Sequence, residues 1–168
     1  MRHLAEAEFT DSELTMYEAL SYMHADLPFK GMRLLRGTTI CLNCGLFFGG
    51  DHPVRGRQCT CKDTKGSTAK PDILIRMNGG LVFDNYGVVR VDGGIHTKNR
   101  KHMMWDYHQV QAMQKHHYKV FIVKNEELKS ELCANAVALY ILTMMQDDNL
   151  YQQYLRSGDM QERCRRPL

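Results

Sequence analysis

Four cysteines in the first half of the chain have the spacing of metal ligands. They form a CxxC pair followed by glycine and then a CxC pair: Cys41, Cys44, Cys59 and Cys61. A CxxC-Gly turn points two thiolates at one centre, and a second close pair completes the tetrahedral shell that Zn²⁺ prefers. The CxC spacing is less favourable, so His52 is an alternative to Cys61 as the fourth ligand. We predict a structural zinc site that orders the glycine-rich insert 41–66, against the alternative of four reduced thiols on a loop.

Two carboxylates and a histidine form a second group with the residue types of a catalytic site. Asp72 begins one apolar run, Asp92 ends a later one, and His96 follows beyond a Gly-Gly turn. If the two runs are adjacent strands, the carboxylates provide oxygen ligands for Mg²⁺, and the imidazole relays a proton from water. Spacing alone favours a simpler interpretation, in which the acids are turn residues and the histidine lies in a loop, because acids are common at strand ends.

Hydrophobic periodicity predicts the elements that must position these residues. Caps, apolar spacing and β-branched runs give helices and strands in the order α, β, β-rich centre, α, β, α, which indicates an α/β or α+β fold. The expected elements are a helix from about 10–12 to 24, a strand within 32–42, strands at 73–75, 81–83 and 88–91, a helix at 101–116, a strand at 120–123 and a last helix at 126–146, begun by Asn125.

The length and composition set the class of protein. With 168 residues, 43% hydrophobic and 24% charged, the chain suits one globular domain, with 41–66 as a zinc-binding insert and 159–168 as a flexible basic tail. The sequence has no apolar run long enough to span a membrane and no secretory leader, so we expect a cytoplasmic protein, either nucleoid-associated or viral in a host cytoplasm. A reducing compartment favours metal binding by the cysteines over disulfides.

Charge is distributed in blocks along the chain. Residues 1–29 carry six acids and one base, a net charge of −5, whereas residues 30–70 carry eight bases and two acids, a net charge of +6. Basic blocks of this kind suit contact with a polyanion such as DNA or RNA. An ordinary solvated surface explains the same pattern equally well.

Three sequence runs resemble the PD-(D/E)XK nuclease superfamily. They are PDILI at 71–75, VVRVDGGIH at 88–96 and VQAMQKHHYKVFIVKNEEL at 110–128. Within the superfamily the chain looks most like the branch that holds the very-short-patch-repair endonuclease, the uncharacterised VDG-x-x-H proteins and the homing endonucleases named for their Glu, Asp, His and Asp. An N-terminal Glu13, with apolar residues three, four and seven positions later, fits the same branch. The resemblance covers roughly residues 10–130.

The resemblance implies a restriction-endonuclease-like core, a central mixed sheet flanked by helices, and a metal-dependent DNA endonuclease. Asp72 and Asp92 would hold catalytic Mg²⁺ or Mn²⁺, and His96 would orient or deprotonate the attacking water. Glu13 would complete the metal shell, and Asp106 would fix the imidazole tautomer or bind metal through water. DNA would be the partner, contacted by basic residues of the insert and of the segment after the histidine: Arg55, Arg57, Lys98, Arg100 and Lys101.

The chain departs from the pattern of this branch at two important positions. Arg90 stands where such proteins commonly have Glu, and Gly94 stands where the usual lysine would follow. The branch uses His in place of that lysine, but Arg90 opens a second hypothesis, a catalytically inactive zinc-containing DNA-binding protein derived from the nuclease fold. A third hypothesis, a zinc-stapled interaction protein, leaves the acids unexplained. A homodimer is left open, with the helix at 126–146 either an interface or part of the core.

Three further expectations concern side chains on the predicted helices. Cys133 should fill the core, because it lies on an apolar helical face. Trp105 should pack at the start of its helix, against the alternative of a wedge between DNA bases. The histidines on or near the same helix should lie at the surface: His102, His108, His116 and His117.

Overall fold

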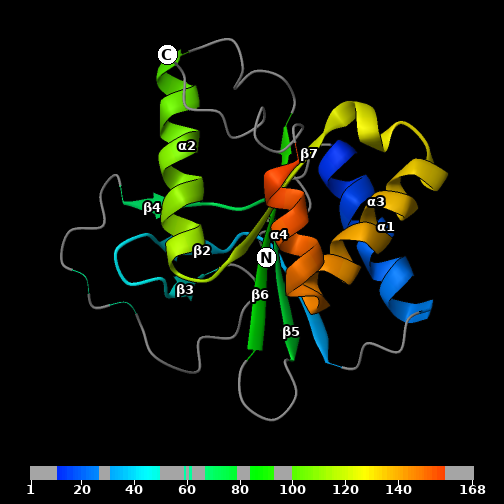
Figure 1. The fold of residues 1–168 in the computed structure, drawn as a ribbon, viewed down its shortest axis with the longest axis horizontal. Helices are drawn as coiled ribbons and strands as arrows, with labels where there is room; N and C mark the ends of the chain where they lie inside the picture. The colour runs from blue at the N-terminus through cyan, green and yellow to red at the C-terminus, as the bar shows by residue number, and fades with distance from the viewer. Residues whose placement is uncertain are drawn as a thin grey trace, which may run out of the picture.

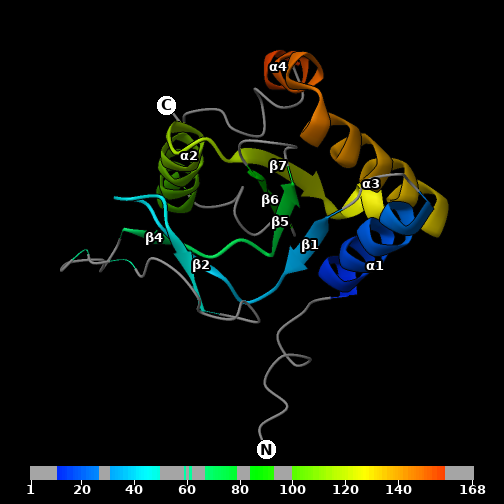
Figure 2. The same ribbon diagram turned by 90° about the horizontal axis from the view of Figure 1, so that it is seen from below.

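The computed structural model describes residues 11–26, 31–49, 59, 61, 67–78, 84–92 and 100–157. These residues form a four-stranded mixed sheet with helices on both faces, and a second, three-stranded sheet (Figures 1 and 2). The expected α+β class and the central mixed sheet flanked by helices are therefore confirmed.

None of the described helices is both long enough and apolar enough to cross a membrane.

The central sheet has the strand order β1-β5-β6-β7, with bounds Met32–Leu35, Ile73–Asn78, Asp84–Asp92 and Lys119–Lys124. β1, β5 and β6 are antiparallel neighbours, whereas β6 and β7 are parallel. A parallel pair needs a long crossover, and helix α2 (Arg100–Lys115) lies between these two strands in the chain. Side chains alternate between the faces of the sheet, so Val88 and Val89 belong to two different core clusters.

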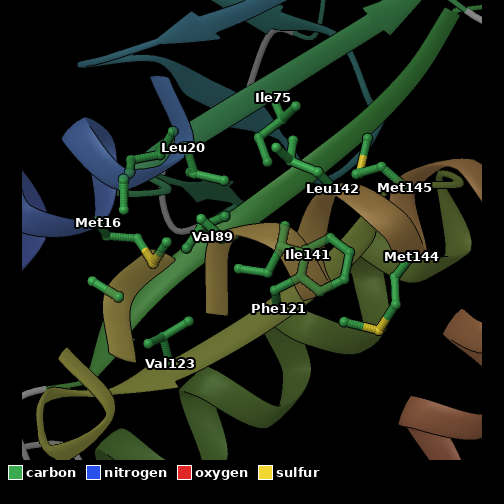
Figure 3. Packing of buried hydrophobic residues seen from close by; sticks show 14 of the residues in the cluster. Met16, Leu20, Ile75, Val89, Phe121, Val123, Ile141, Leu142, Met144 and Met145 are labelled. Carbon is green, nitrogen blue, oxygen red and sulfur yellow. The ribbon is translucent and has the colours of Figure 1, made fainter. Parts of the chain in front are cut away.

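Helices α1 (Asp11–Asp26) and α3 (Glu131–Gln146) lie side by side on one face of the central sheet (Figure 2). They bury Met16, Leu20 and Leu142 against strand residues such as Ile75 and Phe121 (Figure 3). Helix α2 covers the opposite face, where Val110 and Met113 pack with the small sheet. The central sheet therefore has two separate apolar cores, and every one of its strands contributes to at least one of them.

The small sheet has the order β3-β2-β4, with bounds Phe47–Phe48, Thr39–Cys41 and Thr68–Ala69. It divides the segment 32–42, where a single strand was expected. Gly37 adopts a positive φ of 65°, and this turn sends β1 into the central sheet and β2 into the small one. Leu35 before the turn and Ile40 after it lie in the same apolar core, under α2, so the apolar pattern continues across the turn and does not reveal it.

Two strands, and not three, occupy the described part of 73–92. β5 and β6 form an antiparallel pair in which Asn78 lies opposite Asp84. The expected strand at 88–91 is the second half of β6, which is continuous from Asp84 onward. The expected strand at 81–83 lies outside the described residues.

The C-terminal part differs most from the prediction. Asn125–Leu128 forms a short 3₁₀ turn, η2, and α3 begins only at Glu131, where the Ser130 hydroxyl accepts a hydrogen bond of 3.1 Å from the Cys133 N–H. A further helix, α4 (Asp148–Arg156), follows. Its Tyr151 and Tyr154 hydroxyls accept hydrogen bonds from the Val120 and Ile122 N–H groups. α4 thus provides hydrogen-bond acceptors for two N–H groups at the edge of β7, an edge that would otherwise be open to a further strand.

Gly87 is the position of β6 where a side chain has least room. A Cβ atom built there would overlap Met145 Sδ and would lie 3.4 Å from a ring carbon of Phe121. We expect Gly87→Ala to lower the free energy of unfolding by about 1–3 kcal/mol, because Met145 is fully buried and must repack. Urea unfolding of Gly87→Ala, Met145→Ala and the double variant measures this. The double variant should be less destabilised than the sum of the two, and simple additivity would argue against a clash.

Candidate functional site

The four cysteines of the predicted zinc site converge in the structure. The Sγ atoms of Cys41, Cys44, Cys59 and Cys61 all lie within 4.8 Å of one another. The Sγ atoms of Cys44 and Cys59 are 3.6 Å apart, close to the roughly 3.8 Å expected between thiolates at the corners of a tetrahedral Zn–S shell. The donor set and its spacing therefore fit a four-coordinate zinc ion. His52, the alternative ligand, lies outside the described residues.

A tight turn explains why the first cysteine pair points inward. The Gly45 N–H donates to the Cys41 carbonyl at 2.8 Å, and Gly45 has a φ of +78°, which favours glycine. The turn follows β2 directly, so the small sheet fixes Cys41, while the Cys61 N–H donates to Cys59 Sγ at 3.4 Å. Local backbone geometry therefore preorganises both pairs.

The turn is also fixed to the body of the protein. Nε2 of His116 lies 2.8 Å from the Leu42 carbonyl oxygen, and the Tyr118 hydroxyl donates to the Gly45 carbonyl at 2.6 Å. A Cβ atom on Gly45 would come within 2.8 Å of the His116 ring. The cysteine cluster is therefore packed against the turn between α2 and β7, and a side chain at Gly45 would separate them.

The thiol pKa values differ within the cluster. Burial alone would raise the pKa of Cys41, but hydrogen bonds from the Cys44 and Asn43 backbone lower it to about 7. Hydrogen bonds with the neighbouring thiols, that of Cys59 above all, raise the pKa of Cys61 to about 12. Four thiols this close resist full ionisation because their charges repel, and a divalent cation removes that repulsion.

The acidic residues of the second predicted site lie around one end of strands β5 and β6. Asp72 directly precedes β5, and its Oδ2 accepts a hydrogen bond of 2.6 Å from the Val91 N–H. Asp92 is the last residue of β6, and Glu13 lies in the first turn of α1. Antiparallel pairing of β5 with β6 places Asp72 and Asp92 at one end of the sheet, and Glu13 of α1 lies beside Asp72.

Asp72 is the carboxylate whose environment is most unusual. Burial is the main cause that raises its pKa from 3.8 to about 6, and Glu13 adds to this by its charge and by a side-chain hydrogen bond. The Val91 N–H and the charge of Arg90 act in the opposite direction but do not outweigh these effects. Above pH 6 the folded protein therefore carries a partly buried carboxylate that is costly to ionise.

Arg90 and Asp106 form an ion pair beside this end of the sheet. Nη2 of Arg90 donates to Oδ1 of Asp106 at 2.7 Å, and both side chains are about one-fifth exposed, 18% and 21%. The pair joins β6 to the first half of α2. Asp106, expected to act on His96 or on metal, contacts Arg90, and His96 lies outside the described residues.

The structure brings only some of the predicted residues together. Among the described residues, the cysteines are the one group of three or more ligand side chains with mutually close donor atoms, so Glu13, Asp72 and Asp92 do not form such a group. The backbones of Arg100 and Lys101 lie in the first turn of α2. The remaining predicted site residues lie outside the described part: Arg55, Arg57, His96 and Lys98.

Several residues behave differently from their sequence interpretation. Cys133 is exposed and does not fill the core, and Trp105, expected to pack at the start of its helix, is 44% exposed. His116, expected at the surface, is partly buried and contacts the cysteine turn. Lys124 pairs in register with Asp92 at the ends of the parallel strands β6 and β7. The sequence marks Lys124 only by its position at the end of a buried strand.

No protein-family model matches the chain, and comparison with curated proteins and with solved structures gives no significant match. The resemblance to PD-(D/E)XK nucleases therefore remains an expectation that rests on the motif residues.

Proposed function

We propose that the protein is a metal-dependent DNA endonuclease whose fold includes a structural zinc site. The observation that carries the proposal is Asp72, a partly buried carboxylate with a raised pKa, placed beside Glu13 and at the same end of the sheet as Asp92. A buried carboxylate beside a second acid is unfavourable for stability, and perturbed carboxylates are concentrated at functional sites.

The arrangement of the elements supports the same proposal. The central sheet is built in the order α1, three antiparallel strands, α2 and a parallel strand, in agreement with the sequence of motifs on which the resemblance rests. Mg²⁺ commonly uses one or two protein carboxylates, with water and substrate phosphate as its other ligands. Asp72 and Asp92 are suited to hold such an ion, and Glu13 to bind one of its waters. The ion would supply charge neutralisation at the phosphate.

The proposed reaction is hydrolysis of a phosphodiester. The oxygen of a water molecule forms a bond to phosphorus, and the P–O bond to one sugar oxygen breaks. His96 is the proposed acceptor of the water proton, and the departing sugar oxygen takes a proton from solvent, so that the products are a phosphate monoester and a hydroxyl end. Asp72 and Asp92 would hold the cation, which would supply positive charge at the reacting phosphate.

Cleavage of supercoiled, linear and branched DNA tests the proposal. We expect nicking that requires Mg²⁺ or Mn²⁺ and that falls by about 10³-fold or more in Asp92→Ala and His96→Ala, because each removes a group that acts on the reacting atoms. Glu131→Gln, which changes an exposed carboxyl at the start of α3, is the control and should cleave like the native chain. Equal activity in all variants, or none in the native chain, would contradict the proposal.

The Arg90–Asp106 pair favours a second candidate, a zinc-containing DNA-binding protein without catalysis. In this case Arg90 supplies positive charge where a nuclease of this type would have a metal-binding acid. The expected result is salt-sensitive DNA binding that Asp92→Ala and His96→Ala both retain, with no cleavage of any DNA form.

A further inference from the structure

Arg90 lies closer to the carboxylates than its place in the sequence suggests. Ile73 pairs with Val89, so Asp72 and Arg90 are the next residues along the two strands at the same end. Strand alternation places Arg90 and Asp92 on the same face as Val88, the face that α2 covers. Arg90 is also among the charges that act on Asp72. Its guanidinium therefore stands beside the proposed reaction centre.

The guanidinium of Arg90 is held at one point and otherwise available. Within the described part of the chain it makes one hydrogen bond, from Nη2 to Asp106, although a guanidinium carries five N–H donors. The side chain is 18% exposed, and neither Nε nor Nη1 is a buried donor left without a hydrogen-bond partner. Arg76, at the other end of the neighbouring strand, differs because both Nε and Nη2 donate to Asp84, at 2.9 and 2.7 Å.

A fixed arginine with free donors has the chemistry of a phosphate-binding group. The planar guanidinium presents two parallel N–H donors that match two oxygens of a phosphate. Partial burial strengthens its attraction for charge that develops during the reaction. A single carboxylate contact orients such a group without occupying it.

We propose that Arg90 is a catalytic residue that binds the non-bridging oxygens of the scissile DNA phosphate, and that Asp106 is a positioning residue that orients Arg90. The inference rests on the proposed endonuclease function and deepens it. Arg90 then stabilises the negative charge that accumulates on these oxygens as water attacks phosphorus, while the bonds that form and break remain those of hydrolysis. Arg90 stands where proteins of the branch that the chain resembles commonly have Glu, and in this proposal it acts on the phosphate directly.

Single-turnover cleavage by the full-length protein tests this role. At saturating DNA we expect Arg90→Gln to slow cleavage by about 10²–10³-fold, the usual effect of losing one donor to a transition-state oxyanion, with little change in DNA affinity. Arg90→Lys keeps the positive charge but lacks the two parallel N–H donors of a guanidinium, so it should retain part of the cleavage rate. Asp106→Asn should lose about tenfold, since it disturbs orientation alone.

A matched control separates catalysis from structure. Arg76→Gln breaks a comparable arginine–carboxylate pair on the adjacent strand and should leave the cleavage rate unchanged. Free guanidinium ion, added to Arg90→Ala well below denaturing concentration, should restore part of its activity but none of that lost in Asp92→Ala. A purely structural Arg90 would not respond to this addition.

The outcomes of the Arg90 and proposed-function experiments are distinguishable. A native chain that cleaves DNA, together with Arg90→Gln or Arg90→Lys variants that cleave at the rate of Arg76→Gln, overturns the role of Arg90 and leaves the endonuclease intact. Failure of the native chain to cleave any DNA overturns both. If Arg90→Gln does not fold, the Arg90→Lys rate and the guanidinium response of Arg90→Ala decide the question in the same way.

Discussion

Asp72→Asn is expected to abolish metal-dependent cleavage and at the same time to stabilise the folded protein at pH 8. The asparagine keeps an oxygen that can accept the Val91 N–H, so the end of the β5–β6 pair should stay intact. It removes the negative charge that the proposed cation requires, and we expect at least about 10³-fold slower cleavage. When a substitution removes activity but increases stability, the original residue typically serves catalysis and not folding.

The stability effect of Asp72→Asn has a defined pH window. The pKa of Asp72 is about 6 when folded, above its ordinary value of 3.8, so the folded state binds the proton more tightly than the unfolded chain. Below about pH 4 the carboxyl is protonated in both the folded and the unfolded chain, so it does not lower the free energy of unfolding. The native protein then loses stability as pH rises from about 4 to 6, and the loss is complete above 6. For a partly buried group we expect about 1–2 kcal/mol at pH 8.

Urea unfolding at pH 4 and pH 8, with and without Mg²⁺, measures both effects of Asp72→Asn. The variant should exceed the native protein in stability at pH 8 and match it at pH 4. Mg²⁺ should stabilise the native protein at pH 8 and leave the variant unchanged, because a ligand that binds only the folded state stabilises it. Glu126→Gln, which changes an exposed carboxyl, should show neither effect. A destabilised Asp72→Asn at pH 8 would show that the carboxylate serves the fold.

Removal of one cysteine of the cluster should have the largest effect on stability. Cys59→Ser is expected to lower bound zinc from about one ion per chain to almost none. Cys59 and Cys61 lie between β3 and β4 in the chain, and the cluster brings them together with the cysteines of the turn after β2. We expect the free energy of unfolding to fall by about 3 kcal/mol or more, since metal binding contributes directly to folding.

Exposed Cys133 provides the matched control for the zinc prediction. It lies on α3, away from the cluster, so Cys133→Ser should keep both the zinc content and the stability. Metal analysis, thermal unfolding and the thiolate-to-metal absorption of the cobalt-substituted protein measure the difference. If Cys59→Ser binds as much zinc as Cys133→Ser, the cluster is four reduced thiols and not a metal site.

Helix α2 lies between the two sites. Asp106, in its first half, contacts Arg90, and His116, directly after its last residue, contacts the cysteine turn. A change in the metal site therefore acts on the same element that orients Arg90. For this reason the stability of Cys59→Ser must be measured alongside its cleavage rate.

Local pattern was sufficient for much of this protein. The helix expected at 10–24 is α1 at Asp11–Asp26, the helix at 101–116 is α2 at Arg100–Lys115, and the strand at 120–123 is β7 at Lys119–Lys124. Periodicity and capping are properties of neighbouring residues, so they can be recognised without the fold. The cysteine cluster was recognisable for the same reason, because ligand spacing within each pair is local.

Contacts between distant segments decided the rest. The division of 32–42 between two sheets, the covering of the β7 edge by Tyr151 and Tyr154, and the pairing of Arg90 with Asp106 each join residues far apart in the chain. The raised pKa of Asp72 likewise depends on burial and on Glu13, a residue of another element. Burial, local charge and the pairing of strand edges depend on residues that are close in space but distant in the chain. The sequence gives residue types and their spacing, but it does not show which distant residues become neighbours.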